Sequence, residues 1–256
     1  MKGWYAVFHK EVANFFVSPI AYVVAVMFLV ISGFFFWSNI SLMSFYSMKA
    51  AQNPMLAERI TMTNFVTRPL IQNMAIVLLF VIPLLTMRLF AEERRSGCIE
   101  LLLTYPISDT GILVGKFLAT LLLFLAMMAG TCTYPLIMAS LGSPDWGPLV
   151  SGVLGLFLMA AGFVALGMFI SSLTENQIVA GAITFGTALM FWVMSWIATF
   201  TGETTAEVIR QFSLLEHLDT FTKGVISLSD VTYFVWFTAF FLFLTLRSLE
   251  ANRWRG

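Results

Sequence analysis

The sequence predicts an all-α membrane protein: six transmembrane helices with an N-terminal interfacial helix, a short cytoplasmic helix between spans 2 and 3, and short external re-entrant helices before span 6. Composition is the first reason, since 59% of the 256 residues are hydrophobic and only 11% are charged, against about 45–50% and about 25% in soluble domains. A chain of this size could not bury so much apolar surface in water, so a bilayer has to cover it. The second reason is that six runs stay mostly apolar for about 20 residues, the length that crosses a hydrocarbon core.

The interfacial helix covers residues 1–16. Trp4, Phe8, Val12 and Phe15 share one of its faces at helical spacing, as in a helix that lies along a membrane surface. Glu11 intrudes on this apolar side, where a carboxylate needs either a partner or a route to water.

The predicted spans are residues 20–38, 70–87, 112–139, 148–170, 177–200 and 231–249. The second contains Pro83, which a spanning helix tolerates where its neighbours satisfy the freed carbonyl. The fourth is rich in glycine (Gly152, Gly155, Gly162 and Gly167). Small residues at such spacing serve close helix packing or line a substrate path, and both interpretations stay open.

The connections differ in length. We expect a long external loop at 39–68 and a short external turn at 141–148. Residues 201–230 are also external, and their interrupted helical run at 208–225 predicts short helices that dip into the outer leaflet.

The basic residues predict the orientation. Most of the 14 lysines and arginines fall on the side that holds both termini: Lys2, Lys10, Arg88, Arg94, Arg95, Lys116, Arg247, Arg253 and Arg255. The excess of positive charge marks the cytoplasmic side. We therefore expect a multi-pass protein of the bacterial cytoplasmic (inner) membrane with both termini in the cytoplasm.

Several classes of protein are disfavoured. No predicted span has a charge near its middle, although ion-coupled carriers usually keep ionisable groups there. No zinc site, activated nucleophile or aspartate pair is visible, so we predict no catalytic and no metal-binding residues. Cys98 and Cys132 lack redox or metal spacing and lie at different membrane levels, and no basic cluster suggests binding of nucleic acid.

The run from Gly111 to Lys116 superficially resembles a nucleotide-binding loop. It has three residues between its glycines, whereas a P-loop has four, and Phe117 stands where magnesium binding needs Ser or Thr. It also opens a membrane span. We therefore expect no nucleotide site in it.

The strongest positive signal is the cytoplasmic link at 88–108. A charged helical start leads into a short amphipathic helix that stops before Pro106. Its apolar residues, including Ile99, Leu102 and Leu103, are costly to expose, so a partner or the membrane should cover them. A solvated connector is the plainer alternative.

This link resembles the coupling-helix signature of the ABC-2 permease family, particularly its gliding-motility-associated branch, and is also similar to permeases linked to copper-enzyme maturation. Further matching blocks run in order along the chain, at residues 10–11, 18–22, 82–88, 115–117, 171–177 and 212–224. Cys98 departs from the threonine usual in the family, which puts any hydroxyl contact there in doubt.

The resemblance implies one ABC-2 permease domain over residues 1–256. It also implies a second permease copy or paralogue, two cytoplasmic ABC ATPase subunits that hold ATP and Mg, and no cofactor in this chain. The lipid bilayer surrounds the chain, and an auxiliary protein with a periplasmic domain is a further partner. The chain itself would not be an enzyme.

Residues 88–108 would then form the coupling segment that seats in a cleft of the ATPase. The residues implied in coupling are Glu92, Glu93, Arg94, Arg95, Gly97, Glu100, Leu102, Leu103 and Glu11. Glu11 contacts either the ATPase or Arg94 or Arg95, or it snorkels to the interface. On the external side, His217, Asp219 and Lys223 either line a substrate exit as a gate or are surface groups.

The leading functional hypothesis is therefore a transporter permease in which partner ATPases push the coupling segments and rock the spans between inward-open and outward-open states. The alternative from another class is a non-transporting membrane anchor or a force-transmitting component of an envelope or motility assembly. A membrane enzyme is a third hypothesis, for which the sequence offers no nucleophile.

Overall fold

The computed structural model describes residues 3–50, 61–97, 108–142, 144–200 and 202–253. All regular elements in these ranges are helices. The long ones are α2 (Pro19–Ala50), α4 (Arg68–Thr86), α7 (Asp109–Thr131), α9 (Trp146–Leu173), α10 (Gln177–Thr199) and α13 (Leu228–Arg253). The short ones are α1 (Gly3–Val17), the π-helix η1 (Thr63–Thr67), α5 (Ala91–Arg95), α8 (Thr133–Leu141), α11 (Glu203–Gln211) and α12 (Leu214–Thr222).

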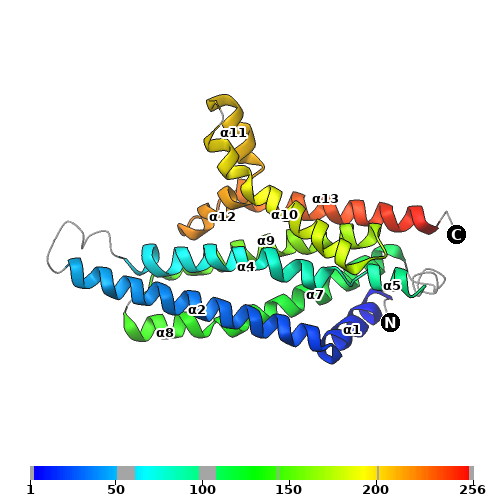
Figure 1. The fold of residues 1–256 in the computed structure, drawn as a ribbon, viewed down its shortest axis with the longest axis horizontal. Helices are drawn as coiled ribbons and strands as arrows, with labels where there is room; N and C mark the ends of the chain where they lie inside the picture. Colours follow the sequence, from blue (N-terminus) through cyan, green and yellow to red (C-terminus); the bar gives the residue numbers. More distant parts are fainter. Residues whose placement is uncertain (1–2, 51–60, 98–107, 143, 201, 254–256) are drawn as a thin grey trace.

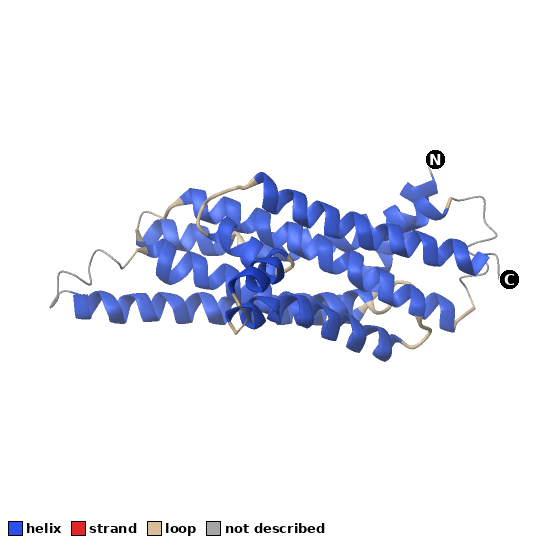
Figure 2. Ribbon diagram, turned by 90° about the horizontal axis from the view of Figure 1, so that it is seen from above, coloured by secondary structure: helices blue, strands red, loops and turns tan. Residues whose placement is uncertain are grey.

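The long helices run side by side along the longest axis of the molecule (Figures 1 and 2). Six helical stretches in the described ranges are long and apolar enough to cross a membrane. The predicted all-α membrane fold with six spans is thus confirmed. Both chain ends lie at the same end of the bundle, which we call the proximal end; the opposite end is the distal end.

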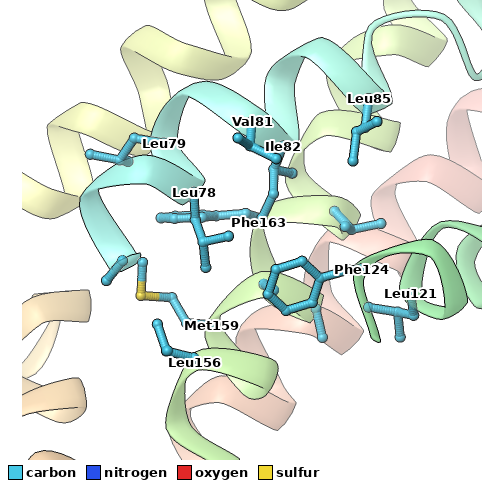
Figure 3. Close-up of a cluster of buried hydrophobic side chains, with 14 of the residues drawn as sticks. Leu78, Leu79, Val81, Ile82, Leu85, Leu121, Phe124, Leu156, Met159 and Phe163 are labelled. Carbon is cyan, nitrogen blue, oxygen red and sulfur yellow. The ribbon is translucent and has the colours of Figure 1, made fainter. Parts of the chain in front are cut away.

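Helix α9 is central, because it packs against α4, α7, α10, α12 and α13. Figure 3 shows the core beside it, where Leu78 and Ile82 of α4 gather with Phe124 of α7 and with Met159 and Phe163 of α9. These side chains are almost inaccessible. By contrast, α2, α10 and α13 expose much of their apolar surface, as helices facing lipid or another subunit do.

The glycines of α9 lie in its contacts with neighbouring helices. A Cβ on Gly167 would overlap the side chain of Thr86 in α4, and one on Gly155 would lie 2.8 Å from Phe221 of α12. Gly152 and Gly162 face Ile71 and Phe237 in the same way. Of the two interpretations of this glycine-rich span, the described contacts favour helix packing.

The predicted start of the first external loop, at residue 39, is wrong. Residues 39–50 continue α2 instead of forming a loop. They contain neither Pro nor Gly, and two of their serines bond inside the helix: Ser41 Oγ donates to the Trp37 carbonyl and Ser47 Oγ to that of Met43. Polar residues that bond to the preceding turn do not end a helix.

The third span is one predicted helix that the structure divides. Helix α7 ends at Thr131, and α8 begins at Thr133. Pro135 explains the break, because a proline without an N–H fits the first turn of a new helix better than a helix interior. The other spans are helices that begin or end within a few residues of the predicted bounds.

Two short helices precede the last span, as expected, with a break at Phe212 and Ser213. Helix α12 packs on α9, whereas α11 stands away from the side of the bundle (Figure 1). The depth of these helices in a bilayer stays a prediction.

Candidate functional site

The proximal end contains a buried charge cluster centred on Lys116 in the first turns of α7. Its ammonium nitrogen lies 2.8 Å from Glu11 Oε1 of α1, 2.9 Å from Glu93 Oε1 of α5 and 2.8 Å from the carbonyl oxygen of Leu89. The Lys116 side chain is only 2% exposed. All three donors of the ammonium group are therefore used, and one side chain joins three helical elements.

This arrangement offsets the cost of burying a charge. Removing an ammonium ion from water is expensive unless opposite charges and hydrogen bonds replace the solvent. Two carboxylates and a carbonyl do so here, with the ring of Phe90 5.2 Å away. Lys10 adds a second positive charge, 3.7 Å from Glu93 Oε1, at the edge of the cluster.

Glu11 differs from both intramolecular expectations. Its side chain is 9% exposed and pairs with Lys116, so it neither snorkels to the interface nor contacts Arg94 or Arg95. The apolar face of α1 includes a carboxylate because Glu11 lies against Lys116 of α7. A contact of Glu11 with an ATPase stays a prediction.

Gly115 brings α1 close to α7. A Cβ at this position would lie 2.8 Å from the backbone oxygen of Trp4 and 2.9 Å from Cβ of Val7. Only glycine permits this approach without displacing α1, and the approach sets Glu11 beside Lys116. Residues 111–116 are helical within α7, as expected for a stretch that is not a phosphate-binding loop.

Ser171, at the end of α9, holds the corner between α4 and α5. Its hydroxyl accepts hydrogen bonds from the backbone N–H groups of Phe90 and Ala91, both at 3.1 Å, and donates to the Met87 carbonyl at 3.1 Å. These contacts use its one donor and both acceptor positions. The start of the predicted coupling segment is thereby fixed to a central span.

The other predicted coupling residues lie in or after α5. Glu92 pairs with Arg88 at 3.6 Å, and Arg94 interacts electrostatically with Glu175, which follows α9. Arg95 is exposed, and Gly97 has a φ of +71°, the left-handed conformation that commonly ends a helix. Cys98, Glu100, Leu102 and Leu103 lie outside the described residues.

A second charge cluster lies on α12, centred on Asp219. Its carboxylate lies 2.9 Å from Arg68 and 2.7 Å from Lys223, and Gln72 donates to it at 3.3 Å. Burial alone would raise the pKa of Asp219, but hydrogen bonds from Lys223 and Arg68 and their positive charges lower it below the ordinary value. The carboxylate is thus held ionised.

The three residues predicted as an external gate do not form one group. Asp219 and Lys223 pair, but His217 turns to the other side of α12, where Nδ1 lies 2.6 Å from Asp230 and the ring stacks on Tyr233. Residues two apart on a helix do not face each other, which explains the separation. A role of these residues in substrate exit stays a prediction.

The sequence analysis did not propose Lys116, Ser171 or Arg68 as site residues. For Lys116 a signal was present: Glu11 on an apolar face and a lysine in the start of a span are each costly alone, and pairing them removes both costs. The role of Ser171 had no such signal, since its partners are backbone atoms.

Comparison with known protein families gives a match. The family model described as ABC-2 family transporter protein matches residues 5–247, nearly the whole chain. A search of curated proteins finds no match.

Proposed function

Because this chain belongs to the ABC-2 family of transporter proteins, we propose that it is the permease subunit of an ABC transporter. It moves a substrate across the cytoplasmic membrane by a conformational change that partner ATPase subunits drive. The proximal end, with both termini, faces the cytoplasm, and a second permease copy or paralogue completes the membrane unit. ATP and Mg bind to the ATPases and not to this chain.

The observation that carries this proposal is the attachment of the coupling segment to the spans. Lys116 joins α5, where the segment begins, to α1 and α7, and Ser171 joins the same corner to α9. Both contacts are buried. A push on residues 88–108 is therefore transmitted to two spans and to the N-terminal helix.

In this mechanism nucleotide binding closes the ATPase pair, and the ATPases displace the coupling segments. Packed helices respond by rigid-body rocking because close-packed interiors deform little. The bundle then alternates between inward-open and outward-open states. The work is mechanical, so no side chain of this subunit takes part in chemistry.

The resemblance also supports finer proposals. The chain belongs to the gliding-motility-associated branch, and an auxiliary protein with a periplasmic domain assembles with it. The segment Glu92 to Leu103 seats in the ATPase, and the α11–α12 region with His217, Asp219 and Lys223 borders the substrate exit.

Affinity purification tests the proposal. The tagged chain is extracted from its native membrane in a mild detergent, and copurifying proteins and ATP hydrolysis are measured. We expect an ATPase subunit at a stoichiometry of one per permease and hydrolysis that elutes with the complex. Recovery of envelope proteins without any ATPase would instead support the membrane anchor, and this proposal would fail.

A further inference from the structure

Two hollows lie one after the other between α2 and α4. The first is a cleft of about 490 Å³ at the proximal end, where α1 and α5 close its sides. The second is a groove of about 620 Å³ farther along the same two helices, with α10 as its third wall. Leu84 belongs to the walls of both, so the two hollows meet at this residue.

The cleft is lined by both polar and apolar side chains. Its polar lining includes Lys10, Asn14, Ser18, Arg88 and Glu92, and its apolar lining includes Ile20 and Leu84. Lys116, Glu11 and Glu93 also border it and pair with one another, although Glu93 Oε2 makes no hydrogen bond.

Arg88 is the basic group of the cleft with spare capacity. Its Nε is buried and makes no hydrogen bond. One terminal nitrogen donates to Ser18 Oγ at 3.3 Å, and the ion pair with Glu92 is long at 3.6 Å. Because the Glu92 side chain is 54% exposed, this pair holds Arg88 weakly. A guanidinium held this weakly can turn toward a phosphate group and bind two of its oxygens.

The groove has the opposite character, since every side chain that lines it is apolar. Met27 and Ile31 of α2, Ile76 and Phe80 of α4, and Ala182 and Phe185 of α10 form most of its wall. From Ile76 to Leu85 the two hollows follow α4 for roughly 14 Å at 1.5 Å per residue. The groove alone follows α4 from Ile76 to Leu84, roughly 12 Å, which is most of the about 15 Å thickness of one leaflet of hydrocarbon.

We propose that these hollows together bind one phospholipid of the leaflet at the proximal end. Its phosphate lies in the cleft against Arg88, with Lys10 nearby, and one acyl chain lies in the groove between α2, α4 and α10. The order of the two hollows, polar at the membrane surface and apolar within the bilayer, matches the order of head and tail in a lipid. The inference requires a bilayer-spanning bundle and not a partner ATPase.

The experiment measures lipid binding to the purified full chain in detergent by native mass spectrometry. The probes are phosphatidylglycerol and diacylglycerol with the same acyl chains, which differ in the phosphate headgroup. We expect the wild type to bind phosphatidylglycerol more tightly than diacylglycerol by about tenfold or more, as for hydrogen bonds to a charged group.

Two pairs of variants test the contact with the lipid phosphate and the contact with the acyl chain separately. Arg88→Gln should remove the preference for phosphatidylglycerol, whereas Arg247→Gln, at an exposed arginine outside the cleft, should keep it. Ala182→Trp fills the groove and should weaken binding of both lipids. Ile183→Trp, at the next and likewise exposed position, should not.

Three results would overturn the inference. Equal affinity of the wild type for the two lipids would show that the protein does not contact the phosphate. If inorganic phosphate displaced phosphatidylglycerol and Ala182→Trp did not change lipid binding, the cleft would be a site for a free anion and not for a lipid. Loss of a permease dimer in Ala182→Trp without a change in lipid binding would assign the groove to a second copy of the chain. Since the ATPase is absent from this assay, its outcome is independent of the test of the transporter function.

Discussion

The two ends of the bundle each hold one charged side chain between two of opposite sign, and they differ mainly in burial. At the proximal end, Lys116, Glu11 and Glu93 have side chains 2%, 9% and 15% exposed. At the distal end, Asp219, Arg68 and Lys223 are 28%, 32% and 53% exposed. Water can replace a lost partner in the second cluster but not in the first. The proximal cluster is therefore the stronger connection between helices, and it lies where the proposed coupling segment begins.

The largest effect is expected from Lys116→Met. The change leaves Glu11 and Glu93 buried without their common partner, and breaking a buried pair costs about 3–5 kcal/mol. Thermal unfolding of the purified chain in detergent should show a large loss of stability. Lys223→Met, the matched change in the distal cluster, should cost far less.

A double variant tests whether the loss comes from the uncompensated charge. Adding Glu11→Gln to Lys116→Met removes one of the two buried carboxylates and should recover part of the stability. Equal stability of Lys116→Met and Lys223→Met would show that burial does not distinguish the two clusters.

An intermediate effect is expected from Gly115→Ala. The added methyl group meets the backbone of Trp4 and Cβ of Val7, and relieving such overpacking typically costs about 1–3 kcal/mol. Displacement of α1 should also lengthen the contact between Glu11 and Lys116. Gly186→Ala is the matched control, because a Cβ at Gly186 of α10 meets nothing within 4 Å. If both variants unfold at the same temperature, the close approach of α1 and α7 does not matter for stability.

The smallest effect is expected from Asp219→Asn, about 1 kcal/mol or less for a partly exposed cluster. Its pH dependence has a definite sign. The pKa of Asp219 is lowered in the folded protein, so its stabilising contribution is fully present above the ordinary aspartate pKa and is lost as the pH falls through the lower folded value. Unfolding curves of the wild type and Asp219→Asn should differ at neutral pH and converge only in acid. A difference that grew in acid would contradict the pairing.

The sequence was sufficient for the six spans, because apolar length alone identifies them. It was insufficient at the end of α2, where Ser41 and Ser47 look like loop residues but bond within the helix. For the candidate sites, residue types such as Glu11 and Asp219 could be recognised as unusual, but their partners Lys116 and Arg68 are more than a hundred residues away in sequence. Packing of distant helices decides such pairs. The cost of burying Glu11 and Lys116 separately is a signal for the first pair, but nothing in the sequence indicates the pair of Asp219 with Arg68. The separation of His217 from Asp219 could have been predicted from the sequence, since helical spacing alone places them on different sides of α12.

The central claim, that the proximal end is the coupling surface, is tested most directly by ATPase retention on Glu100→Arg. Glu100 lies in the coupling segment outside the described residues, and reversing a charge at a desolvated contact typically costs about 2–5 kcal/mol. We predict normal amounts of the variant in the membrane but ATPase retention weakened by about thirtyfold or more. Cys98→Thr in the same segment and Asp219→Asn at the distal end should both retain the ATPase. Retention by Glu100→Arg equal to that of the wild type would show that the segment is a solvated connector and would contradict the account.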